Sequence, residues 1–87
     1  RDDGSFILSG AASADVLTDR LGLQLRADRD FTTVAGFALE VLKHLPEVGE
    51  KFSHDGWSFE IIDLDGRKID KLIASRLKRR EKPPPQA

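Results

Sequence analysis

The sequence predicts a small α+β domain in which a short antiparallel sheet packs against two helices. An apolar stripe at helical spacing in the middle of the chain predicts the longer helix. After it, alternating apolar and polar runs joined by Asp-Gly pairs predict hairpins. A short apolar run near the start predicts a further strand. With 87 residues, the chain has room for one domain and one core.

The first strand and the first helix are expected within the opening part of the chain. Residues 5–9 lie between an Asp-Gly turn signal and Gly10, which is typical of a short strand. Ser13 can accept a hydrogen bond from a free backbone N–H at the start of a helix over residues 14–21. Gly22 stands where a helix commonly ends in the left-handed conformation.

A longer helix is predicted over residues 33–45, with Thr32 or Thr33 as its cap and Pro46 as its stop. Gly36 within it costs about 1 kcal/mol relative to alanine, so we expect close packing against another backbone there. One face carries apolar side chains at helical spacing. These are Val34, Phe37, Ala38, Val41, Leu42 and Leu45.

The C-terminal half predicts three strands, over residues 51–54, 57–64 and 67–76. Asp55-Gly56 and Asp65-Gly66 separate them, and Asp-Gly favours two-residue type I′ turns because both turn residues need a positive φ. These strands form an antiparallel meander, which the N-terminal strand joins. We expect the most buried residues to include Val34, Phe37, Val41, Leu45, Phe59 and Ile61.

Strict alternation fails in two places within this meander. Leu64 is out of phase with the apolar set that ends at Ile61, and Ile69 and Leu72 are three residues apart. A β-bulge near Asp70-Lys71 would restore the alternation in the last strand.

The composition and the motifs argue against catalysis and cofactor binding. Cysteine is absent, which excludes disulfides and thiolate nucleophiles and favours a reducing compartment. A net charge of −1 gives no general attraction to nucleic acid. The serines lack a nucleophile elbow, and no glycine-rich phosphate loop is present. We therefore predict that the chain is not an enzyme, with no catalytic residue, no metal site and no cofactor-binding residue that can be named.

Two histidines and two aspartates are the candidate metal ligands in this sequence. His44 and His54 are the only histidines, and no third ligand has recognisable spacing. Asp63 and Asp65 are two apart on a strand and share a face, which could hold a divalent ion. The turn chemistry of Asp-Gly and solvent exposure explain these two aspartates better.

Residues 78–87 are basic and then proline-rich, and we expect a disordered tail after a domain over residues 2–77. Lys78, Arg79, Arg80 and Lys82 could attract an anionic membrane weakly, at about 1 kcal/mol per basic residue. A purely solubilising tail is the favoured alternative. No apolar run is long enough to cross a bilayer, so we expect this piece to be soluble. Its start, Arg1-Asp2-Asp3-Gly4, has no initiator Met and no signal-peptide h-region, so we expect a piece of a longer polypeptide.

The ordered set of short motifs resembles the CorC/HlyC transporter-associated domain over residues 2–77. The motifs are Asp3-Gly4-Ser5-Phe6, Leu21-Gly22-Leu23, Phe31-Thr32-Thr33-Val34-Ala35-Gly36, Leu45-Pro46-Glu47-Val48-Gly49-Glu50, Trp57-Ser58-Phe59-Glu60-Ile61 and Asp65-Gly66-Arg67-Lys68-Ile69.

This resemblance implies a cytosolic domain at the C-terminal end of hemolysin-like and magnesium/cobalt-efflux membrane proteins. It would lie at the cytoplasmic face of the plasma membrane, after a pair of cystathionine-β-synthase-type (CBS) domains and the transmembrane region. Its implied role is to modulate ion transport through protein contacts, with a homodimer as an open alternative. The family fold is similar to part of the FAD-binding PCMH-type fold, so FAD or adenine-nucleotide binding is the alternative function. A purely structural terminal cap is a third.

Overall fold

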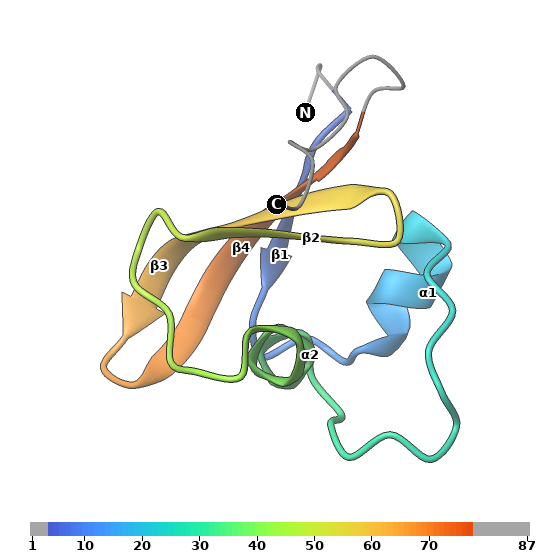
Figure 1. The fold of residues 1–87 in the computed structure, drawn as a ribbon, viewed down its shortest axis with the longest axis horizontal. Helices are drawn as coiled ribbons and strands as arrows, with labels where there is room; N and C mark the ends of the chain where they lie inside the picture. The colour runs from blue at the N-terminus through green and yellow to red at the C-terminus, as the bar shows by residue number, and fades with distance from the viewer. Residues whose placement is uncertain (1–3, 78–87) are drawn as a thin grey trace, which may run out of the picture.

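In the computed structural model, residues 4–77 form a four-stranded antiparallel sheet with two helices (Figure 1). The elements are β1 (Phe6–Ser9), α1 (Asp15–Leu21), α2 (Val34–Leu42), β2 (Lys51–His54), β3 (Trp57–Asp65) and β4 (Lys68–Arg76). The strand order is β1-β4-β3-β2, so the N-terminal strand joins the predicted meander at its β4 edge. The predicted α+β class is confirmed. The tail prediction lies outside the described residues.

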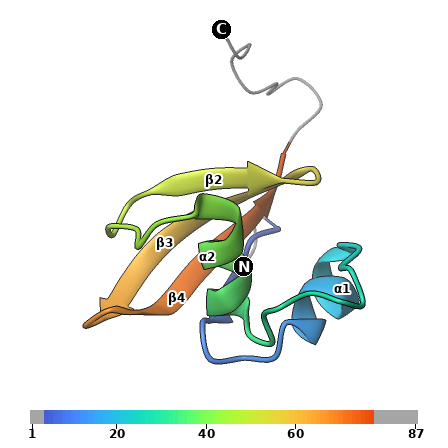
Figure 2. The same cartoon turned by 60° about the horizontal axis from the view of Figure 1, so that its bottom comes forward.

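Both helices pack on one face of the sheet (Figure 2). The strands send alternate side chains to that face, where the residues of β3 are Trp57, Phe59 and Ile61, all at most 4% exposed. They share one core with Leu17 of α1 and Phe37 of α2. Helices and sheet therefore bury each other, and among residues 4–77 no element covers the opposite face of the sheet.

The two hairpin turns differ from each other. Asp55 and Gly56 have φ values of 53° and 87°, as a type I′ turn requires, and this prediction is confirmed. The second turn was placed one residue too early, because Asp65 still pairs with Lys68. Its central residues are therefore the two that follow Asp65. Only the first of them, Gly66, has a positive φ, of 63°, which is the pattern of a type II′ turn.

The register between β3 and β4 shifts twice, which explains the broken alternation in both strands. Ile61 pairs with Leu72 and Asp63 with Lys71, so one residue of β3 is left over. Leu64 then pairs with Ile69, so Asp70 is left over on β4. The bulge expected near Asp70-Lys71 is therefore present, and it allows Ile69 and Leu72 both to reach the core.

The bulge also anchors the end of β1. Gly10 donates its backbone N–H to the carbonyl of Asp70 at 2.8 Å, and its own carbonyl accepts from the N–H of Ala35 at 2.9 Å. A Cβ atom on Gly10 would lie 1.9 Å from the carbonyl oxygen of Ile69. Glycine is required here because two backbones come too close for any side chain.

Helix α2 begins as predicted but ends earlier. The Thr33 hydroxyl accepts a hydrogen bond from the Gly36 N–H at 3.1 Å, which caps the helix. A Cβ on Gly36 would lie 2.7 Å from that of Phe31, so Gly36 does pack closely, but against this side chain and not against another backbone as expected. Lys43 adopts the left-handed conformation, with φ 65°, and ends the helix after Leu42. Leu45 therefore leaves the apolar stripe and is 43% exposed, not buried as predicted.

The remaining burial predictions are mostly confirmed. Val34, Phe37, Phe59 and Ile61 are buried, whereas Val41 is only partly so, because it faces a hollow in the surface. Helix α1 ends at Gly22, whose φ of 75° is left-handed as expected.

Candidate functional site

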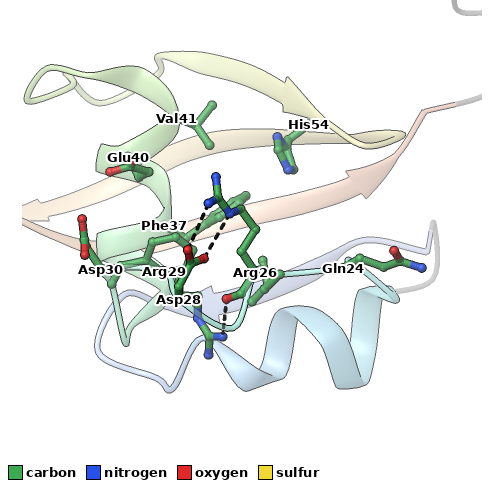
Figure 3. Close-up of a pocket in the computed structure, with 11 residues that line it drawn as sticks. Gln24, Arg26, Asp28, Arg29, Asp30, Phe37, Glu40, Val41 and His54 are labelled. Carbon is green, nitrogen blue, oxygen red and sulfur yellow. Dashed lines mark hydrogen bonds and ion pairs between the residues drawn. The ribbon is translucent and has the colours of Figure 1, made fainter.

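A hollow in the surface lies beside α2 and is bounded by residues 24–31, hereafter the 24–31 loop. It forms because the chain leaves the core after α1 and returns to it before α2. Leu23 is buried at the exit, and Thr32 accepts a hydrogen bond from the Ala14 N–H at 2.9 Å at the return. Between these two anchors the loop stands away from α2 and the end of β2. A hollow of about 550 Å³ is left between them (Figure 3).

The exit of the loop is fixed by the single tryptophan. The indole Nε1–H of Trp57 donates to the carbonyl of Leu21 at 3.0 Å, a buried bond that holds the end of α1 against the sheet. On the Trp57 ring lies the guanidinium of Arg76, 4.8 Å from the ring centroid. The loop thus starts from a rigid point, and its position relative to the sheet is set by the core.

The floor of the hollow is apolar. Phe37 is 2% exposed and contacts the rings of Phe31, Phe52 and Phe59 at centroid distances of 5.8, 6.2 and 5.5 Å. Val41 follows Phe37 one turn later on α2. His54 forms a wall at the end of β2, with its ring edge-on to that of Phe37 at 5.3 Å. This packing fixes the orientation of the imidazole.

The rim of the hollow is charged. Arg26 donates from Nε and Nη2 to the two carboxylate oxygens of Asp28, both at 3.1 Å (Figure 3). Both side chains are more than 70% exposed, so this pair contributes about 0–1 kcal/mol to stability. Asp30 has no hydrogen-bond or ion-pair partner within residues 4–77. Glu40, in the last turn of α2, pairs with Lys43 at 3.1 Å.

Arg29 has a structural role in the same loop. Its Nη1 donates to the Arg26 carbonyl at 3.1 Å, and its Nη2 pairs with Asp15 of α1 at 3.3 Å. The guanidinium also lies 5.6 Å from the centroid of the Phe31 ring. Arg29 therefore ties the 24–31 loop to α1, although its Nε is buried without a partner in the described part of the chain.

The two histidines considered as metal ligands occupy different surroundings. His44 lies beyond the end of α2, where its Nδ1 bonds the carbonyl of Leu42 at 2.9 Å and its Nε2 bonds a carboxylate oxygen of Glu50. The expectation that His44 is in the last helical turn is wrong because the helix ends at Leu42. His54 lies at the hollow. Across residues 4–77, no three histidine, aspartate or glutamate side chains gather in a way that could hold a metal ion.

Asp63 and Asp65, the two aspartates considered as metal ligands, are paired with lysines of β4. Asp63 is paired across the sheet with Lys71, whose Nζ lies 3.8 Å from its carboxylate, and Asp65 is paired with Lys68. Cross-strand charge pairing on an exposed face accounts for both carboxylates. None of the described helices is long and apolar enough to cross a membrane.

Sequence reasoning missed the hollow. No periodicity marks residues 23–30, so nothing in the sequence predicts where they lie. The one available signal was the density of charge around Asp28 and Asp30, next to the apolar residues Leu23 and Leu25. The expectation that FAD or an adenine nucleotide binds this chain stays a prediction.

Together, the fold and the surface define a small α+β domain with an ordered core, a charged hollow and exposed apolar groups at the end of α2. The chain belongs to the CorC_HlyC family, described as the transporter associated domain, whose family model matches residues 1–78.

Solved structures of similar domains have the same fold. The transporter-associated domain of a Xylella fastidiosa hemolysin, solved in complex with Mg²⁺ and Mn²⁺, is 40% identical to this chain. The match covers 90% of this chain and 94% of that one, with a TM-score of 0.78. A CorC_HlyC domain from Haemophilus ducreyi is 28% identical over the same shares of the two chains, with a TM-score of 0.79.

Among curated relatives, the polyamine export protein of Haemophilus influenzae is 28% identical over 82 residues, which is 93% of this chain and 19% of that protein. The chain thus spans less than a fifth of the length of this relative and of those from Synechocystis and Salmonella typhimurium. Similar sequences therefore occur as one part of larger transport proteins.

Proposed function

We propose that this chain is a non-catalytic accessory domain that regulates a cation-exporting membrane protein from its cytoplasmic face. The observation that carries the proposal is its membership of the transporter-associated family, in relatives about five times its length. One of those relatives is named for polyamine export, and polyamines are organic cations. The domain acts through contacts with other parts of the same protein, such as the CBS pair and the transmembrane region that the resemblance implies.

The contact surface that we assign to this role is the segment of residues 43–50, hereafter the 43–50 loop. It exposes two large apolar side chains, Leu45 at 43% and Val48 at 60%, and Leu39 of the preceding helix α2 is 38% exposed. A small monomeric domain gains nothing from an apolar cluster in water, whereas such a cluster is typical of an interaction surface. The rest of the exporter is the partner that is always present.

Hydrogen bonds hold this loop in one shape. Gly49 donates its N–H to the carbonyl of Ile61 at 2.7 Å, and the Glu47 N–H donates to the carboxylate of Glu50 at 3.1 Å. His44 bonds that same carboxylate and so closes the loop on itself. The apolar side chains are therefore displayed on an ordered backbone, and binding does not have to immobilise the loop first.

The test replaces the apolar pair in the full-length exporter, as Leu45→Ser with Val48→Ser. We expect the regulation of cation export to be lost while the amount of protein in the membrane stays the same. Ile7→Ser is the matched control, because Ile7 is an apolar side chain of similar exposure, 55%, on the opposite face of the sheet. Unchanged export in the double variant would remove this surface from the proposal.

Export lost equally in the control would show a general effect of lost apolar surface. A domain that is only a structural terminal cap predicts a third result, in the yield of the exporter. If the domain only protects its parent from unfolding, the variants lower the yield of the exporter and leave the transport rate per molecule unchanged.

A further inference from the structure

We infer that the hollow between the 24–31 loop, α2 and β2 binds a zwitterionic ligand, a free amino acid or short peptide with an apolar side chain. The regulatory proposal uses the 43–50 loop and leaves this hollow without a role. Three properties point to this ligand class: hydrogen-bond donors, two carboxylates of which one is unpaired within residues 4–77, and an apolar floor (Figure 3).

The donor side is built around Arg26. Its side-on edge, Nε and Nη2, is occupied by Asp28, and this leaves the end-on edge of the guanidinium, formed by Nη1 and the second hydrogen of Nη2. Nη1 has no partner among residues 4–77. With Asp28 in this position, the end-on edge is a fork that matches a second carboxylate.

His54 completes the donor side. Its ring is held edge-on against Phe37, and neither ring nitrogen has a hydrogen-bond partner within residues 4–77. A neutral imidazole still carries one N–H. Arg26 and His54 both line the hollow (Figure 3), and we assign both to the carboxylate of the ligand.

The acceptor side carries Asp30 and Glu40, which Figure 3 shows across the hollow from His54. Asp30 is exposed and unpaired in the described part of the chain, and Glu40 is engaged only by the exposed side chain of Lys43. Exposed ion pairs of this kind exchange at little cost. A ligand ammonium group can therefore bind Asp30 directly and can share the carboxylate of Glu40 with Lys43.

The floor selects against ligands that carry charge alone. Val41, which is half-buried, offers apolar surface to the body of a ligand beside the buried ring of Phe37. An inorganic anion or cation would use one side and gain nothing from the floor, and a simple amine would leave the fork of Arg26 empty. The volume of about 550 Å³ suits a small organic molecule. Because the hollow is open to solvent, we expect affinity in the high micromolar to millimolar range.

The test is a titration of the ¹⁵N-labelled 87-residue chain with L-phenylalanine, followed by amide chemical shifts. We expect shifts that saturate and that are confined to the 24–31 loop, α2 and the end of β2. N-acetyl-phenylalanine lacks the ammonium and phenylalanine amide lacks the carboxylate, so each should bind about tenfold more weakly. No saturable shifts, or equal binding by the blocked compounds, would overturn the inference. So would saturation of the same amides by FAD or AMP, which would favour the nucleotide alternative.

Two variants locate the ends of the ligand. Arg26→Gln should weaken the binding of phenylalanine but leave that of phenylalanine amide, which lacks the carboxylate, unchanged. Asp30→Asn should weaken the binding of phenylalanine but leave that of N-acetyl-phenylalanine, which lacks the ammonium group, unchanged. Arg67→Gln and Asp65→Asn make the same charge changes at the exposed second hairpin, and we expect no effect. Equal losses in the variants and their controls would show a general charge effect and would refute the assigned roles. This result is independent of the export assay, so the inference and the proposed function fail separately.

Discussion

Gly10→Ala tests the junction where β1, β4 and α2 meet. The φ of Gly10 is one that alanine can adopt, so the whole cost comes from the contact of the new methyl group with the carbonyl oxygen of Ile69. That contact would be 1.9 Å, and ordinary van der Waals contact begins at 3.4 Å. The two backbones would have to separate by about 1.5 Å.

A separation of this size costs more than overpacking alone. Inserting a methyl group into a well-packed site typically costs about 1–3 kcal/mol. The bond from the Gly10 N–H to the Asp70 carbonyl, 2.8 Å long, would be stretched beyond hydrogen-bond range. Its loss adds about 0.5–1.5 kcal/mol. We therefore expect a total loss of about 2–4 kcal/mol, from a domain whose stability is near the lower end of the usual range of about 5–15 kcal/mol.

Urea unfolding followed by fluorescence measures this loss directly, because Trp57 is the single tryptophan and is only 4% exposed. Ala11→Ser, at the exposed neighbouring position, is the control and should change stability by less than about 0.5 kcal/mol. A loss below about 1 kcal/mol for Gly10→Ala would refute the close approach of β1 to the bulge in β4.

Three further predictions follow from the packing and the charges. Phe37→Ala should lower the free energy of unfolding by about 3–5 kcal/mol, measured by urea unfolding, because it removes a buried ring that contacts three phenylalanines and a histidine. Trp57→Phe keeps the ring packing but removes the bond to the last carbonyl of α1, and we expect a loss of about 1–3 kcal/mol by thermal unfolding. The N–H of Glu47 and then the His44 side chain lower the pKa of Glu50 below its ordinary 4.5. The ionised carboxylate therefore contributes stability that is complete above pH 4.5 and is lost as the pH falls through the lowered value. Glu50→Gln should remove that part of the pH dependence, and a profile as steep as that of the unchanged chain would contradict it.

The fold could be predicted from the sequence because its signals are local. The turn at Asp55-Gly56 depends on the φ preference of two adjacent residues, and the stripe on α2 depends on a period of 3.6 residues. Even the bulge at Asp70 could be inferred, since Ile69 and Leu72 are both apolar and three apart. In each case the residues that carry the signal are neighbours in the chain.

The end of α2 could not be predicted in the same way. Leu45 continues the apolar period, but Lys43 takes a left-handed conformation that is uncommon for residues other than glycine. The bonds of His44 to the Leu42 carbonyl and to Glu50 fold the chain back after the helix. These contacts depend on the loop as a whole, and the local sequence offers only Pro46 as a stop.

The hollow was beyond sequence reasoning for a similar reason. It exists because the segment before α2 returns to the segment after β1, as the bond between Ala14 and Thr32 shows. Residues 24–31 have no period that predicts where they lie. Arg26, His54 and Glu40 come from a loop, a strand and a helix, and only the tertiary fold brings them to one surface.

The most direct test of the central claim is the rate of cation export by the full-length parent protein with and without residues 1–77. The transported cation, a polyamine or a divalent metal, would be added outside inside-out membrane vesicles that contain equal amounts of each protein, and its rate of uptake per molecule measured. A regulatory domain predicts that deletion changes this rate or its dependence on cation concentration. If both proteins transport at the same rate over the whole concentration range, the chain does not regulate export.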